Sequence, residues 1–243
     1  MEGNREITRA LEAGVEFREV YVCQKSRKKT DIPATSSRDV ADLNFEKFTD
    51  SKISVYEVNE AIFSKISYGN RTEGVLAVCS PSLTNLYDLP SKKSPFFVVI
   101  EGVEKPGNLG AILRTCDGAG VDGVIICDGK TDIYNPNVIR SSLGAVFSLN
   151  VIVASGEDAV QFLRKEKINI YAALPGTKSI YTNPDLRKGT AVVVGSEQKG
   201  LTAFWSQHAD CKVRIPMKGR VDSLNVSAAT AILLYEVIRQ RSQ

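Results

Sequence analysis

Three polar loops in the C-terminal half of the sequence each follow an apolar segment that is typical of a β-strand. The first, GVEKPGNLGAILRT, has Asn108 where a helix N-cap is expected. Arg114 follows it by six residues, with a guanidinium that can bind a phosphate or carboxylate through two hydrogen bonds. The second, VVVGSEQKGLT, carries Glu197, and the third, IPMKGRVDSLN, ends in Ser223 and Asn225. Because ligands of open α/β sheets bind at the carboxyl ends of the strands, the three loops together indicate one shared cleft.

Each loop taken alone also has an ordinary structural explanation. Glu197 could be an exposed loop carboxylate, and Ser223 and Asn225 could cap a core helix that binds nothing. The fingerprints of nucleotide-binding loops are missing. Gly107 and Gly110 do not have the GxGxxG spacing, and no Gly-Lys-Ser/Thr follows them. A dinucleotide site or a phosphate-binding loop of these standard types is therefore not expected.

Histidine and cysteine usage argues against several other kinds of site. The only histidine is His208, so a Ser-His-Asp triad or a histidine-ligated metal would depend on it alone. The five cysteines are odd in number and scattered, with no CxxC pair. This pattern indicates reduced thiols in a cytosolic setting, without a disulfide scaffold or a metal site.

An alternation of strands and helices must position the three loops. Apolar segments of strand type alternate with helical segments, and FFVVIEG is a continuous apolar run, typical of a parallel sheet covered on both faces. The expected strands are 96–102, 122–128, 149–155, 168–176, 190–195 and 211–216, and the expected helices are 108–120, 135–147, 156–167 and a long one after Asn225. The C-terminal part is therefore predicted to be an open parallel sheet wrapped by helices, assigned to residues 96–243.

The final helix is apolar over much of its circumference. Two neighbouring faces are formed by Val226, Ala229, Leu233 and Val237, and by Ala228, Ile232, Tyr235 and Ile238. Such a helix is expected to be buried against more than one surface.

The first 80 residues predict a small α/β domain of their own. Helices are expected at 4–13, 37–48 and 59–66, and strands at 16–22, 52–58 and 74–80. Basic residues in its loops could reach phosphates, although a solvated charged loop would look the same: Lys25, Arg27, Lys28, Lys29 and Arg71. Residues 81–95 carry three prolines and little periodicity, which favours a linker.

Bulk composition limits the partners. The 243 residues are 43% hydrophobic and 24% charged with a net charge of +3, so binding of nucleic acid would need a local basic patch. No apolar run approaches the roughly 18–20 residues of a membrane span, and the N-terminus has no signal-peptide core.

Three motifs resemble those of a known family. NLGAILRT, VVGSEQKGL and IPMKGRVDSLNVSAATAILLYE are similar in order and spacing to the signatures of the SpoU (TrmH-like) RNA ribose 2′-O-methyltransferases of the SPOUT superfamily. RSSLGAVF and AALPG are lesser matches, and the similarity runs over about residues 96–241. The first 80 residues resemble the ribosomal-protein-like RNA-binding domain often fused ahead of this catalytic domain. The chain starts within a segment of that domain, which implies that its usual N-terminal portion is shortened or missing.

This resemblance implies a fold, a cofactor and a partner. The family forms a deep trefoil knot, binds S-adenosylmethionine in a bent form against the knotted loops, and works as homodimers with the site near the interface. The positions that match the cofactor pocket are Leu174, Gly176, Gly195, Ile215, Met217 and Leu224. Arg114 matches the arginine proposed to help deprotonate the ribose hydroxyl. Asn108, Glu197, Ser223 and Asn225 match the polar positions that place the ribose, the arginine and the cofactor.

The leading hypothesis is therefore a cytoplasmic RNA ribose methyltransferase that uses S-adenosylmethionine. Ribosomal RNA of the 23S type is the favoured substrate over transfer RNA because of the fused N-terminal domain. The alternatives are a transfer-RNA methyltransferase, a non-catalytic RNA-binding protein with the same fold, and a nucleotide-dependent enzyme of the doubly wound type.

Overall fold

The computed structural model describes residues 1–23, 53–68, 73–81, 85–89 and 92–243, and these form two compact units. The smaller unit comprises Met1–Ser82 with Leu143–Ser148, and the larger comprises Leu83–Ser142 with Leu149–Gln243. Among the described helices, none is long and apolar enough to cross a membrane.

The smaller unit is built on a three-stranded sheet in the order β2-β1-β3, with β1 parallel to β2 and antiparallel to β3. Helix α1 buries Ile7 and Ala10 in a core with Phe17 and Val20 of the sheet. Its elements are α1 (Asn4–Glu12), β1 (Phe17–Cys23), β2 (Ser54–Val58), α2 (Glu60–Ile66) and β3 (Val75–Cys79), and the short α5 (Ala145–Ser148) is grouped with them. These described elements confirm the predicted ones. The expected helix at 37–48 and the basic residues Lys25, Arg27, Lys28, Lys29 and Arg71 lie outside the described residues.

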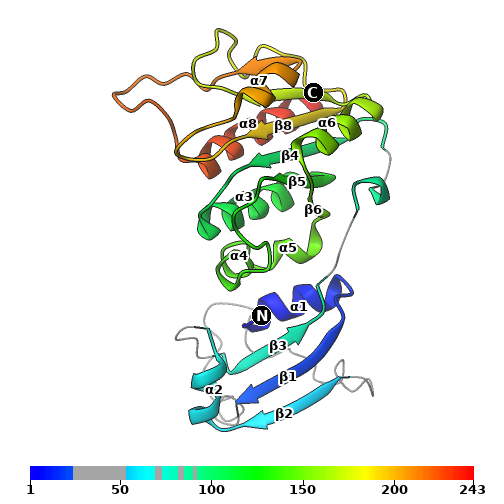
Figure 1. Ribbon diagram of the computed structural model, residues 1–243, viewed down its shortest axis with the longest axis vertical. Coiled ribbons are helices and arrows are strands. Elements are labelled where there is room, and N and C mark those ends of the chain that lie inside the picture. The colour runs from blue at the N-terminus through cyan, green and yellow to red at the C-terminus, as the bar shows by residue number, and fades with distance from the viewer. Residues whose placement is uncertain (24–52, 69–72, 82–84, 90–91) are drawn as a thin grey trace. The chain divides into compact units, whose positions relative to one another are not determined.

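The larger unit is an open sheet of six strands in the order β6-β5-β4-β8-β7-β9, and every neighbouring pair is parallel. This confirms the predicted parallel α/β architecture. Strands β4, β5, β6 and β8 of this sheet are labelled in Figure 1. Its strands are β4 (Phe96–Glu101), β5 (Gly123–Cys127), β6 (Val151–Val153), β7 (Asn169–Ala173), β8 (Thr190–Val194) and β9 (Cys211–Val213). Its helices are the 3₁₀ turn η3 (Leu86–Asp88), α3 (Pro106–Ala119), α4 (Pro136–Ser141), α6 (Gly156–Lys165), α7 (Ala203–His208) and α8 (Val226–Arg241).

The inner strands β5, β4 and β8 are buried on both faces, as expected for strands that are almost continuously apolar. Every residue of β4, β5 and β8 is buried. On one face Phe97 and Val193 pack in a core with Phe162 of α6 and Trp205 of α7. Leu86 belongs to the same core, so the stretch expected as a linker contributes to it.

Two details of the helices differ from the sequence prediction. The helix expected over 135–147 is two helices, because Leu143 and Gly144 both adopt positive φ, at 54° and 81°. Helix α8 buries Leu233, Leu234 and Val237, whereas Tyr235 is 53% exposed. Within one chain, therefore, one of the two apolar faces of α8 is largely buried, with only Ala229 half-buried, and the other stays partly exposed.

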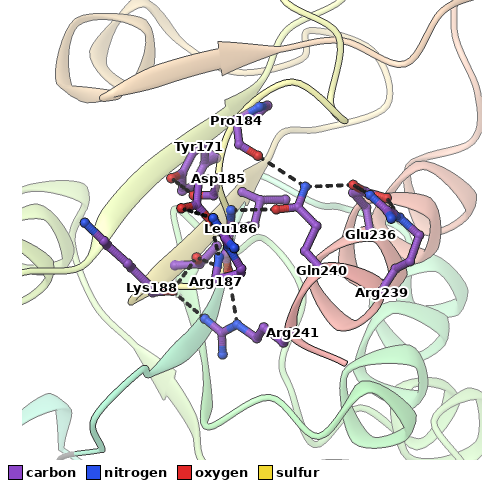
Figure 2. A network of polar contacts seen from close by, with 11 residues as sticks. Tyr171, Pro184, Asp185, Leu186, Arg187, Lys188, Glu236, Arg239, Gln240 and Arg241 are labelled. Carbon is purple, nitrogen blue, oxygen red and sulfur yellow. Dashed lines mark hydrogen bonds and ion pairs between the residues drawn. The ribbon is translucent and has the colours of Figure 1, made fainter. Parts of the chain in front are cut away.

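The C-terminal turn of α8 is fastened to the rest of the unit by polar contacts (Figure 2). The Arg241 guanidinium donates to the carbonyls of Ser94 (2.9 Å), Pro95 (3.2 Å), Leu186 (3.1 Å) and Lys188 (2.6 Å). Burial lowers the pKa of Arg241. The Gln240 side chain adds two hydrogen bonds: it accepts one from the Leu186 N–H at 2.9 Å and donates one to the Pro184 carbonyl at 3.2 Å. One arginine thus ties α8 to the segments that precede β4 and β8.

We expect Arg241→Met to lower the free energy of unfolding by about 2 kcal/mol, because it leaves four backbone carbonyls, three of them in partly buried hydrogen bonds, without their charged donor. Trp205 is the only tryptophan and is fully buried in this unit, so its fluorescence in a urea titration reports the change. The control is Arg187→Met, which breaks an exposed ion pair with Asp185 and should lower the stability much less than Arg241→Met does. Equal stabilities of the two variants would contradict the role given to Arg241.

Candidate active site at the carboxyl edge of the sheet

The strand order places the segments that carry the expected site residues at one edge of the larger unit. Strands β4, β8, β7 and β9 are consecutive neighbours and parallel, so their carboxyl ends lie side by side. The segment after β4 leads to Asn108 and Arg114 in α3. The segments after β8, β7 and β9 carry the other expected residues: Gly195 and Glu197; Leu174 and Gly176; Ile215, Met217, Ser223, Leu224 and Asn225.

Asn108 joins three of these segments through its side-chain amide. Its Nδ2 donates to Glu197 Oε1, and its Oδ1 accepts from Asn225 Nδ2 at 3.2 Å. The Asn225 Oδ1 in turn accepts from the backbone N–H of Ser227 at 2.9 Å and from its hydroxyl at 2.6 Å. The structure therefore brings Glu197, Asn108 and Asn225 together in one hydrogen-bonded chain.

Asn108 reaches this chain because it does not cap its helix, contrary to the sequence prediction. Helix α3 starts at Pro106, and Lys105 occupies the N-cap position without a side-chain cap bond. Proline fits the first helical position, since it lacks the N–H that would have no partner there. Asn108 lies in the first turn instead, and its amide is free to bond across to the other loops. Of the two capping residues expected for α8, only Asn225 takes that position.

Arg114 and Ser223 are not part of the hydrogen-bonded chain Glu197–Asn108–Asn225. Arg114 is exposed on α3, about 9 Å along the helix axis from Asn108 at 1.5 Å per residue. Ser223 is exposed in the loop that precedes α8. Neither side chain makes a hydrogen bond or ion pair with another residue in the part of the chain that the structure describes.

The loop that carries Glu197 is tight. The backbone of Ser196 and Gly200 pairs in both directions, at 3.2 and 3.0 Å. A Cβ on Gly195 would lie 2.2 Å from the carbonyl carbon of Gly200, so a larger residue cannot stand there without moving the loop. Glu197 is thereby held at the tip of the turn, beside a small hollow lined by Glu104, Lys105, Ser196, Glu197, Gln198 and Lys199.

The segments after β7, β8 and β9 could hold a flat, partly apolar cofactor. Leu174, Ile215 and Met217 are half-buried and Leu224 is 37% exposed, while the space around Gly176 is open. Within the described residues, the backbone N–H and C=O groups of Ile215 and Met217 have no intramolecular partner. Half-buried backbone groups without partners suit the edge of a heterocyclic ring, so these residues fit the expected cofactor.

An ion pair lies next to the hollow beside Glu197. Lys130 donates to Glu104 at 2.6 Å, and this bond lowers the pKa of the Glu104 carboxyl, with a smaller contribution from Lys199. No cluster of three or more potential metal-ligating His, Cys, Asp or Glu side chains occurs among the described residues. A larger hollow of about 530 Å³ beside the edge strand β6 is lined by none of the expected site residues.

Sequence reasoning missed Glu101, the last residue of β4. Its carboxylate is buried and accepts two hydrogen bonds from Thr202. The available signal was a charged residue that ends an otherwise apolar strand, since a buried charge requires partners.

Known proteins share both units. The SpoU rRNA methylase family matches residues 95–235, and the MRM3-like substrate binding domain matches residues 1–77. The 23S rRNA (guanosine-2′-O-)-methyltransferase RlmB of Haemophilus ducreyi is 34% identical over 197 residues, which covers 78% of this chain and 80% of the relative.

Solved structures agree with these matches. The crystal structure of an RNA 2′-O ribose methyltransferase has a TM-score of 0.80 and 35% identity, covering 100% of this chain and 88% of the other. An AdoMet-bound rRNA methyltransferase from Sinorhizobium meliloti has a TM-score of 0.85 and 28% identity, covering 98% and 86%. The segments that meet at Asn108 all fall within the matched region, and this chain belongs to the SpoU rRNA methylase family.

Proposed function

We propose that this protein is an S-adenosylmethionine-dependent methyltransferase that modifies a ribose 2′-hydroxyl of ribosomal RNA, of the 23S type. The observation that carries the proposal is the Glu197–Asn108–Asn225 chain, which unites three loops at one sheet edge in a member of this family. Relatives named as 23S rRNA methyltransferases and a neighbour solved with AdoMet support the substrate and the cofactor. We further propose a cytoplasmic location, which an rRNA substrate supports.

The chemistry requires orientation and control of one proton. When bound, S-adenosylmethionine supplies an electrophilic methyl group, whereas a ribose hydroxyl is a poor nucleophile until its proton is removed. We assign the cofactor to Leu174, Gly176, Gly195, Ile215, Met217 and Leu224.

The polar residues orient the ribose. Asn108 and Asn225 present amide groups at the cleft, and Glu197 fixes the orientation of the Asn108 amide by accepting its N–H. Ser223 lies two residues before Asn225 and is exposed, so its hydroxyl is available to the RNA backbone.

Arg114 assists the removal of the proton from the ribose hydroxyl. A guanidinium has a pKa of about 12 or more in water, so it is a reluctant base. It serves either as a base whose pKa is lowered by a neighbouring positive charge or desolvation, or as a cation that stabilises the developing alkoxide. Its exposure on α3 leaves it free to contact RNA.

Basic side chains around the cleft support an RNA substrate. The net charge of +3 is small, so phosphates must be met locally. The loops at the carboxyl edge expose Lys105, Lys178, Lys199, Lys218 and Arg220.

The exposed face of α8 supports a homodimer. Tyr235 and Ala228 are exposed and Ile232 and Ile238 are half-buried, on a helix that is apolar almost all round. Covering this face with a second copy would remove apolar surface from water next to the segment that carries Asn225.

A non-catalytic RNA-binding role is the second candidate. It is favoured only by the isolation of Arg114 from the Glu197–Asn108–Asn225 chain.

Arg114→Ala is expected to reduce methyl transfer by at least about 10²-fold, since it removes the group that acts on the hydroxyl proton. Affinity for S-adenosylmethionine, measured by calorimetry, should stay within about threefold because Arg114 lies outside the cofactor segments. Arg187→Ala is the matched control and should turn over normally. Near-normal turnover of Arg114→Ala, or failure of the unaltered protein to bind S-adenosylmethionine, would favour the non-catalytic role.

The double variant Lys218→Ala with Arg220→Ala should weaken RNA binding and reduce the magnitude of the slope of log K against log salt by about 1.4, because each of two phosphate contacts releases about 0.7 counterion. Filter binding of an rRNA fragment at several salt concentrations measures this slope. Lys165→Ala with Lys167→Ala, at and just after the C-terminal end of α6, removes the same charge and should leave the slope unchanged. Identical slopes for the two double variants would remove the support that the loop cations give to RNA binding.

Tyr235→Glu should convert a dimer to a monomer by placing a charge on the exposed face of α8. Sedimentation equilibrium of the full chain measures the mass directly. Tyr87→Glu changes a tyrosine of similar exposure, 57% against 53%, away from α8 and should leave the dimer intact. A dimer that survives Tyr235→Glu, or a monomeric unaltered protein, would overturn the assignment of this face.

A further inference from the structure

Glu101 is a buried carboxylate that the chemistry assigned above does not use. It ends β4, whose other five residues are apolar and buried, and it is 5% exposed. A charge in such a place is stable only when hydrogen bonds replace the water that it loses. The hydrogen-bond partners of Glu101 therefore show which segment of the chain it holds in place.

Both oxygens of Glu101 are occupied by the same residue. Oε2 accepts from the backbone N–H of Thr202 at 2.7 Å, and Oε1 accepts from the Thr202 hydroxyl at 2.7 Å. Thr202 stands at the N-cap of α7, where a threonine hydroxyl normally accepts a hydrogen bond from its own helix, but here it makes no such bond. The hydroxyl is turned instead toward the end of β4.

This contact closes the loop that carries Glu197. The loop leaves β8 at Gly195, next to β4 through the Ile100–Val194 pairing, and turns back tightly at Gly200. Thr202 is its exit. The loop is thus fixed at its entry by the sheet and at its exit by Glu101, with Glu197 between them bonded to Asn108.

We propose that Glu101 is a positioning residue for methyl transfer: through Thr202 it holds the 195–202 loop in the place where Glu197 meets the Asn108 amide. This rests on the proposed function. Without the hydrogen bonds between Glu101 and Thr202, the loop would still form its own turn, but its tip would no longer be fixed against α3. A displacement of about 1 Å at a catalytic constellation can cost up to about 10²-fold in rate.

The test uses Thr202→Val, because truncating Glu101 itself could unfold the protein. Valine keeps the backbone N–H and the shape of threonine but loses the hydroxyl that bonds Oε1. We expect kcat to fall about tenfold while the Kd for S-adenosylmethionine stays within about threefold. Thr202→Ser, which restores the hydroxyl, should recover most of the rate.

The control removes the same kind of group elsewhere. Thr190 begins β8 at the opposite edge of the sheet, is buried, and donates to the carbonyls of Leu186 and Lys188. Thr190→Val should lower stability but leave kcat unchanged. If Thr202→Val and Thr190→Val lowered kcat equally, the effect would be general destabilisation and the proposal would be wrong.

A double-mutant cycle separates action through Glu197 from any other route. In a Glu197→Ala background, Thr202→Val should change kcat by less than twofold, because the Glu197 carboxylate that the Glu101–Thr202 contact positions is already gone. Multiplicative losses in the double variant would overturn the proposal while leaving the methyltransferase function intact. Absence of methyl transfer by the unaltered protein would instead refute the proposed function.

Discussion

The whole arrangement depends on one side-chain amide that donates and accepts at once. Asn108 gives its N–H to the Glu197 carboxylate and takes an N–H from Asn225. A carboxylate at this position could not donate to Glu197 and an ammonium could not accept from Asn225, so neither could make both of these bonds. These bonds link residues 89 and 117 positions apart, and they define where the cleft is.

The sheet makes that meeting possible. Because all six strands are parallel, every crossover returns the chain to the same end, and the order β4-β8-β7-β9 sets the four relevant segments side by side. Strands β4 and β8 are buried along their whole length, so other elements cover both of their faces. Small residues then allow close approach: Gly195 admits the backbone of Gly200, and Gly110 admits α4, where a Cβ would lie 1.9 Å from the Ser141 hydroxyl.

Helix α8 connects this cleft to the stability of the unit. Its first residues are capped by Asn225, which is itself a member of the hydrogen-bonded chain, and its last turn is tied by Arg241 to four backbone carbonyls. One face packs into the unit and the other leaves Tyr235 exposed. A single helix therefore joins the site, the fastening of the C-terminus and the surface proposed for a second subunit.

The sequence alone determined the alternation of described strands and helices, the parallel sheet, the family and the segments that would meet, because apolar periodicity and short motifs are local properties of the chain. Only the tertiary structure decided that Asn108 lies inside α3 and not at its cap, that Leu143 and Gly144 split a helix, and that Arg114 and Ser223 stand apart from the hydrogen-bonded chain. It alone showed Glu101 bonded to Thr202, 101 residues away. Contacts of this range leave no local signature, since they arise from the packing of strands whose order the sequence does not state.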